Sequence, residues 1–213
     1  MTLTYNSLIA DVLGYLNRDD AATTAAIPLF ISNAEQRICR EAPTIGTESY
    51  VVGEFIAGNP VYAKPGRWRA TLAINFGSGA TYDFRNQLYL RDYDTVRNYW
   101  PDDTVQGFPK FYADYGYSNL LIAPTPNDNY PFELCYLELP EQLSAANQTN
   151  WLTNYAPDVL LYATLLETGS YLKDDERIPM WESYYGRAIA SLKNQNHSRL
   201  LDRVSNVEAD RGP

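Results

Sequence analysis

The sequence contains few residues that could act as catalytic groups. Its single histidine, His197, lies among polar residues near the end of the chain, so a buried Ser-His-Asp or Cys-His arrangement has little to build on. A histidine-rich metal site is excluded for the same reason. The two cysteines, Cys39 in a helical pattern and Cys135 in a strand pattern, form neither a disulfide framework nor a metal site, and we expect small buried side chains in a reducing compartment.

Neighbouring carboxylates occur at three places: Asp19-Asp20, Asp102-Asp103 and Asp174-Asp175-Glu176. Paired carboxylates are what a glycosidase or a site for a hard cation needs. All three groups lie beside predicted helix ends or turns, where solvated charge is their ordinary use. The cluster Gly77-Ser78-Gly79 lacks the lysine and the spacing of a phosphate-binding loop and predicts a hairpin turn. We therefore expect no enzyme activity, no cofactor and no metal.

The composition is that of a folded, acidic protein. Of the 213 residues, 45% are hydrophobic and 20% are charged, which argues against global disorder. The formal net charge is -9 and the sequence has no basic patch, so a general DNA-binding protein is excluded. No run approaches the roughly 18 to 20 apolar residues of a membrane span, and no basic and apolar leader opens the chain. We expect no membrane contact and a protein that is cytoplasmic when made.

Tyrosine is unusually frequent, with 18 tyrosines and an aromatic content of 14%. Tyrosine combines a large contact area with a hydroxyl that needs water or a partner. The excess therefore favours surfaces that contact proteins or carbohydrates. A tyrosine-rich β core and rim explains the same composition equally well.

The stretch from residue 151 to residue 195 organises the rest of the chain, because it contains two apolar helical patterns. After a predicted loop at residues 149–154, Pro157 and Asp158 suit the first turn of a helix. A charged break follows at residues 173–177. The apolar positions of the two helices are Val159, Leu160, Tyr162, Ala163, Leu166 and Leu172, then Trp181, Tyr184, Tyr185, Ala188, Ile189 and Leu192. This helical hairpin needs partner helices to cover it.

The beginning of the chain supplies two such helices. Thr4 suits the N-cap of the first, which ends at the polar residues 17–20, and a linker is predicted at residues 21–26. The second helix stops at Pro43 and carries Arg37 and Arg40 on its polar side. The two apolar stripes are Leu8, Ile9, Val12, Leu13 and Leu16, then Ile27, Phe30, Ile31, Ala34 and Ile38.

Between these helices the apolar residues alternate, which is typical of strands. Strands are predicted at residues 50–56, 61–65, 67–76, 110–115, 120–124 and 132–140, with a further one starting at residues 82–84. A short helix is predicted at residues 90–99, with Tyr93, Val96 and Tyr99 on one side.

These elements predict an α+β protein with a discontinuous helical bundle. Neither terminal pair of helices can hide its apolar face alone, so we expect residues 1–45 and 144–195 to form the helical domain together. Residues 46–143 would form an inserted β-rich domain. Residues 196–213 are polar with scattered apolar anchors, so we expect an extended C-terminal arm that is disordered until it docks.

The order of these segments resembles the head-to-tail adaptor (connector) proteins of short-tailed bacteriophages, over nearly the whole chain. None of the segments that carry the resemblance is a catalytic signature, so its specificity comes from their order and number. They are Tyr5 to Leu16, Ile27-Pro28-Leu29-Phe30-Ile31-Ser32-Asn33-Ala34-Glu35-Gln36-Arg37-Ile38, Gly107-Phe108-Pro109-Lys110-Phe111-Tyr112, Leu121-Ile122-Ala123-Pro124-Thr125-Pro126, Asn150-Trp151-Leu152 and Ala156-Pro157-Asp158-Val159-Leu160-Leu161-Tyr162-Ala163.

The resemblance implies a structural protein of the virion. It implies a homo-oligomeric ring, a dodecamer by likeness, seated under the portal protein and assembled in the host cytoplasm. The helical domains would surround the DNA exit channel, through which DNA passes without specific binding. The β-rich domain would meet tail nozzle or tail fibre proteins.

Two groups of residues are candidates for the contacts of such a ring. Arg199, Leu200, Leu201, Arg203 and Val204 of the arm are candidates for portal binding, because Leu anchors flanked by Arg suit a groove with an acidic rim. Candidates for contacts between subunits are Arg37, Arg40, Asp174, Asp175, Tyr184 and Tyr185, with the two arginines facing the acidic run of a neighbour. For Trp181, packing in the core is the better prediction.

The function predicted from the sequence is therefore that of a non-enzymatic head-to-tail adaptor. The alternative is a carbohydrate-binding or glycan-processing phage tail module, which the tyrosine-rich β-rich domain would suit.

Overall fold

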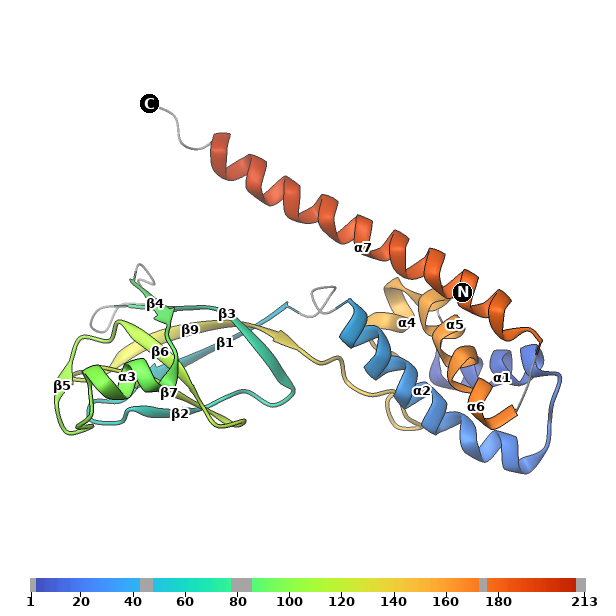
Figure 1. Cartoon of the computed structure of the whole chain (residues 1–213), viewed down its shortest axis with the longest axis horizontal. Coiled ribbons are helices and arrows are strands. Elements are labelled where there is room, and N and C mark those ends of the chain that lie inside the picture. The colour runs from blue at the N-terminus through green and yellow to red at the C-terminus, as the bar shows by residue number, and fades with distance from the viewer. Residues whose placement is uncertain (1–2, 43–47, 78–85, 173–175, 210–213) are drawn as a thin grey trace. The chain divides into compact units, whose positions relative to one another are not determined.

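The computed structural model describes residues 3–42, 48–77, 86–172 and 176–209. It is a mixed α+β protein, which confirms this part of the prediction. The chain divides into two compact units (Figure 1). The helical unit comprises Met1–Thr47 and Pro140–Pro213, and the β unit comprises Glu48–Leu139.

The first two helices of the helical unit start at polar caps. Helix α1, Tyr5–Leu16, begins at Thr4, whose Oγ1 accepts a hydrogen bond from the Ser7 N–H at 3.2 Å. Helix α2 spans Ala21–Glu41, so the predicted linker at residues 21–26 is wrong. The cause is Asp20, which accepts from the Thr23 N–H at 2.8 Å and starts the helix before the apolar stripe.

The remaining helices of this unit come after the β unit in the chain. Helix α4, Trp151–Tyr155, lies where a loop was predicted, because Asn150 and Thr153 form a capping box. Helix α5, Pro157–Glu167, begins at proline as predicted, and α6 spans Gly169–Leu172.

Helix α7, Ile178–Ala209, has 32 residues and continues beyond the other helices of its unit (Figure 1). The prediction of a disordered arm is therefore wrong for residues 196–209, which are helical. Extending a helix that tertiary packing has already nucleated requires little free energy per residue, and this explains how a polar segment continues α7.

The core of the helical unit forms where α2 packs on α5 and α5 packs on α7. The buried side chains at its centre are Leu8, Val12, Ile27, Ile31, Leu160, Leu165 and Trp181. A buried carboxylate lies at the edge of this core. Glu35 is 4% exposed and accepts hydrogen bonds from the Leu143 N–H at 3.3 Å and from the Asn150 side chain at 2.6 Å. Glu35 thereby fixes the segment that leads into α4.

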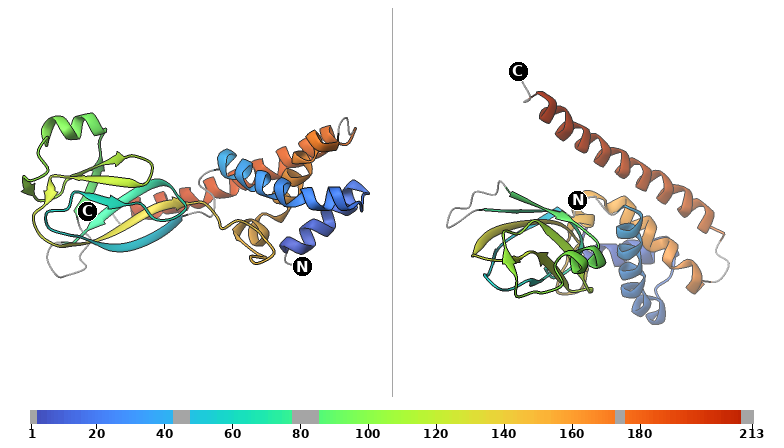
Figure 2. Two further views of the ribbon diagram at one scale, coloured as in Figure 1. Left: turned by 90° about the horizontal axis from the view of Figure 1, so that it is seen from below. Right: turned by 60° about the vertical axis from the view of Figure 1, so that its left-hand side comes forward.

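The β unit is built on a curled sheet, which Figure 2 shows in two further views. Its strand order is β1-β9-β3-β4-β6-β7-β2, and β5 pairs with β8. The strands are β1 Glu48–Phe55, β2 Val61–Ala63, β3 Trp68–Phe76, β4 Asn86–Leu90, β5 Gln106–Gly107, β6 Phe111–Tyr115, β7 Asn119–Ala123, β8 Thr125–Pro126 and β9 Tyr130–Glu138. The strand start predicted at residues 82–84 lies outside the described residues.

Two apolar clusters stabilise the β unit. One includes Phe55, Phe76 and Leu134. The other joins the short helix α3, Tyr93–Tyr99, to β6 and β7 through Val96, Ala113 and Leu121. On α3, Val96 is 1% exposed, whereas Tyr99, which was predicted on the same side of the helix, is 74% exposed.

Candidate functional site

A polar pocket of about 470 Å³ lies on α2, toward the C-terminal end of the helix. Residues three and four apart are neighbours on a helix surface, so α2 contributes one polar side, and Glu167 at the end of α5 adds a further wall. The lining side chains are Asn33, Gln36, Arg37, Arg40, Glu41 and Glu167. Charged and amide groups of this kind suit a polar or charged group of another molecule.

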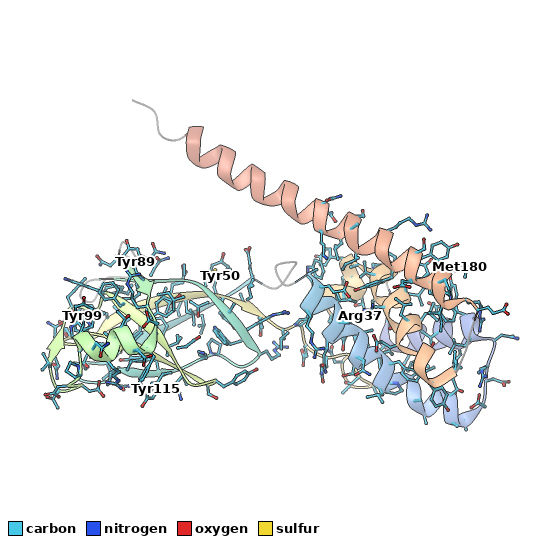
Figure 3. The ribbon with its side chains drawn as sticks, viewed as in Figure 1. Arg37, Tyr50, Tyr89, Tyr99, Tyr115 and Met180 are labelled. Atoms are coloured by element: carbon cyan, nitrogen blue, oxygen red, sulfur yellow. The ribbon has the colours of Figure 1, made fainter. Side chains whose placement is uncertain are left out.

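Arg37 connects three helices at this pocket (Figure 3). Its Nε lies 3.0 Å from Oε1 of Glu41, one turn further along α2, and its Nη1 lies 3.3 Å from Oε1 of Glu167. Its guanidinium also stands over the ring of Tyr185 in α7, with Cζ 5.1 Å from the ring centroid. Arg37 is therefore engaged on several sides within its own subunit.

Tyr185 of α7 contacts both Arg37 and Glu41. It is 4% exposed, and its hydroxyl donates a hydrogen bond to Oε2 of Glu41 at 2.9 Å. Burial, and then the hydrogen bond to the Glu41 carboxylate, raise the pKa of Tyr185, so the hydroxyl remains a donor. Burial alone would lower the pKa of Arg37, but the hydrogen bond and the charge of Glu41 outweigh burial, and the pKa lies above its usual value.

Arg40 has a different environment. It is exposed, and its Nη2 donates to Oε1 of Gln36 at 3.3 Å. Within the described part of the chain it forms no ion pair. The pocket thus contains one arginine held by two carboxylates and one arginine held by a single amide.

A tyrosine cluster forms a second surface of the helical unit, where α1, α5 and α7 meet. The ring centroids of Tyr162 and Tyr184 lie 5.2 Å apart, and Arg187 stands over the Tyr184 ring at 4.8 Å. Burial, and then the adjacent Tyr15, raise the pKa of Tyr162. Tyr15 is 46% exposed and Met180, one turn before Tyr184, is 43% exposed. Tyr, Met and Arg are the residue types enriched in protein interfaces.

The structure divides the predicted residues for subunit contacts between these two surfaces. Arg37 and Arg40 lie at the pocket and Tyr184 in the tyrosine cluster, while Tyr185 is buried in its own subunit. Asp174 and Asp175 lie outside the described residues. Their roles between subunits stay predictions.

Sequence reasoning missed several members of both surfaces. The i, i+4 spacing of Arg37 and Glu41 was a signal that could have identified this pair. Glu167 lies 130 residues from Arg37, and Tyr15 and Tyr162 come from different helices, so no local pattern links them.

The predicted portal-binding residues lie in the distal part of α7: Arg199, Leu200, Leu201, Arg203 and Val204. The backbone there is helical, so these residues belong to a helix and not to an extended peptide.

Arginine also covers aromatic rings in the β unit. Arg97 lies over the rings of Tyr93 and Tyr115, with its Cζ 5.6 and 5.9 Å from their centroids, and forms an ion pair with Asp103. A sugar could not stack on the ring faces that Arg97 already occupies. Tyr50, Tyr89, Tyr99 and Tyr115 lie at separate places on the β unit (Figure 3).

The described residues contain no group of three or more His, Cys, Asp or Glu side chains that could hold a metal ion. Among them, no helix is both long enough and apolar enough to cross a membrane.

The family model of the SU10 adaptor protein matches residues 3–207. No curated protein matches the sequence.

Proposed function

Because the chain belongs to the SU10 adaptor protein family, over residues 3–207, we propose that it is the head-to-tail adaptor of a bacteriophage. The family is one of structural phage adaptors, which confirms the resemblance noted in the sequence. In the proposed function, copies of the chain form a ring, a dodecamer by likeness, that docks under the portal protein. The ring then provides the attachment platform for the tail in the virion.

The observation that carries the docking step is the length of α7. Leu192 is the last buried residue among those of α7 whose side chains are described. The helix continues to Ala209, 17 residues later (209 minus 192). At about 1.5 Å per residue this is roughly 25 Å of helix beyond Leu192.

The sequence of this distal segment suits a groove on a partner. Leu200, Val204 and Val207 recur at i, i+4 and i+7, the spacing of one helix side, and Arg199 and Arg203 flank them. A helix with this pattern binds by laying its apolar side into a groove, and the arginines favour an acidic rim. We assign this groove to the portal protein.

The two surfaces of the helical unit support a ring. A ring needs two different surfaces on each subunit, because a head-to-tail contact joins unlike patches. The polar pocket on α2 and the tyrosine cluster on α1, α5 and α7 provide two such surfaces. The net charge of -9 suits a channel through which DNA passes without being held.

The β unit is then available to tail nozzle or tail fibre proteins. Its exposed tyrosines are well suited to protein contacts. The carbohydrate-binding alternative has less support, because the family is one of adaptors and because Arg97 covers the rings of Tyr93 and Tyr115.

The test is analytical ultracentrifugation of the full chain with the portal protein of the same phage. We expect a stable high-mass complex, and its loss in a variant that ends at Gln195. A double variant, Leu200→Gln with Val204→Gln, should also lose the complex. The control, Ser198→Gln with Ser205→Gln, changes two polar positions that lie outside this apolar spacing in the same segment, and it should keep the complex. A full-length chain that never joins the portal would overturn the proposed function.

A further inference from the structure

The two arginines of the α2 pocket differ in the partners that their guanidinium groups have. Arg37 has two carboxylates and an aromatic ring in its own subunit. Arg40, one helical turn away on an exposed side, has only the Gln36 side-chain oxygen within the described residues. A guanidinium presents a planar fork of donors that matches a carboxylate, so Arg40 leaves most of its donor capacity to a partner.

The pocket beside Arg40 offers hydrogen-bond donors to a carboxylate. Its volume of about 470 Å³ is large enough for one acidic side chain together with the backbone that carries it. Asn33 and Gln36 line it on the side of Arg40 and contribute amide donors. Glu41 and Glu167 are already engaged with Arg37, so the cation that remains to be paired is Arg40.

A matching carboxylate lies at the other end of the helical unit. Glu176 is exposed and lies two residues before the start of α7, as the last residue of the acidic run 174–176. It borders the tyrosine cluster, because the next residue, Arg177, donates from Nη1 to the Tyr15 carbonyl at 2.6 Å. Figures 1 and 2 show that the beginning of α7 and the end of α2 lie at opposite ends of the unit.

We propose that the Arg40 pocket of one copy binds Glu176 of the neighbouring copy, beside whose tyrosine cluster α2 then packs. One copy cannot bring its own Glu176 to its own Arg40, so the pair forms between copies. Because the two patches differ, the contact is head to tail and repeats around a ring. This inference rests on the proposed adaptor ring and specifies which arginine and which carboxylate join its subunits.

Zero-length cross-linking tests the contact directly. The variant Arg40→Lys keeps the charge and provides an amine that a carbodiimide joins to a carboxylate in direct contact. A mixture of unlabelled and nitrogen-15-labelled chains is assembled on the portal and digested after cross-linking. We expect a peptide pair that joins Lys at position 40 to Glu176 and carries both labels. The control variant Arg18→Lys, at another exposed arginine, should not form this link.

Charge reversal gives a second readout. Arg40→Glu and Glu176→Arg should each weaken assembly on the portal by roughly tenfold, since like charges would then face each other. A mixture of the two variants should assemble again, because every contact then joins opposite charges. The controls Arg18→Glu and Glu182→Arg should assemble like the unchanged chain.

The possible outcomes separate this inference from the proposed function. If the unchanged chain assembles on the portal, but position 40 does not cross-link to Glu176 of another copy and charge reversal has no effect, the contact is wrong and the adaptor function stands. If the unchanged chain does not assemble on the portal, both proposals are wrong.

Discussion

The buried carboxylate of Glu35 should make the stability of the helical unit depend on pH. Glu35 is 4% exposed and accepts hydrogen bonds from the Leu143 N–H and from the Asn150 side chain. Burial raises the pKa of Glu35 from 4.5 to about 7, although both hydrogen bonds oppose that rise. The perturbation that isolates this effect is Glu35→Gln, which keeps the length and one acceptor oxygen but cannot ionise.

The sign of the effect follows from proton binding. Between pH 4.5 and about 7 the folded chain holds a proton on Glu35 that the unfolded chain releases, so stability falls as the pH rises. The loss is complete above the folded pKa. A pKa difference of about 2.5 corresponds to about 3 kcal/mol, since one pKa step is about 1.4 kcal/mol.

The assay is urea unfolding at pH 4.5, 6, 7 and 8, followed by helical circular dichroism. We expect the free energy of unfolding of the unchanged chain, minus that of Glu35→Gln, to fall by about 3 kcal/mol between pH 4.5 and 8. The subtraction cancels the other titrating groups. Glu182→Gln, at an exposed position of α7, is the control for the change from Glu to Gln itself. A level difference for Glu35→Gln would refute the reasoning.

Substitutions at three other positions test further features of the structure. Asp114→Ala should lower the stability of the β unit by about 1 to 2 kcal/mol, because it removes the ion pair, at 2.8 Å, of a Lys64 side chain that is only 3% exposed; Trp68 fluorescence during urea unfolding reports this. Trp181→Phe should destabilise by less than about 2 kcal/mol and Trp181→Ala by about 3 to 5, because the buried indole N–H has no partner to lose among the residues that the structure describes. Thermal unfolding compares the two variants, and equal losses would contradict the explanation. Gly186→Ala should raise the melting temperature, by a gain of about 0.5 to 1 kcal/mol, because the added Cβ meets open space inside α7; a loss of stability would contradict it.

The sequence predicted most of the regular elements because their signals are local. Pro157 begins α5 as expected, and the alternating residues of the β-rich region correspond to strands. Two of the helical segments that were missed, residues 21–26 and 151–155, start at side-chain caps on Asp20 and Asn150, where the apolar pattern has not yet begun.

The candidate site was less predictable, because its partners are distant in the chain. Arg37 and Arg40 were identified as polar residues of a helix, but Glu167 and Tyr185 come from later helices. The strand order could not be predicted for the same reason. The parallel pairing of Tyr89 with Phe111 joins strands that a helix separates, and no local pattern predicts it.

The pairing of the first and last strands of the β unit has a consequence for the replacement of this unit by another sequence. Glu48 lies opposite Leu137 in the antiparallel pair β1–β9, so the two ends of the inserted segment are only about 5 Å apart. A short Gly-Ser bridge could therefore replace residues 48–139, and a different insert with adjacent ends could take their place. Such a replacement would leave the two ends of the helical frame at the same distance from each other.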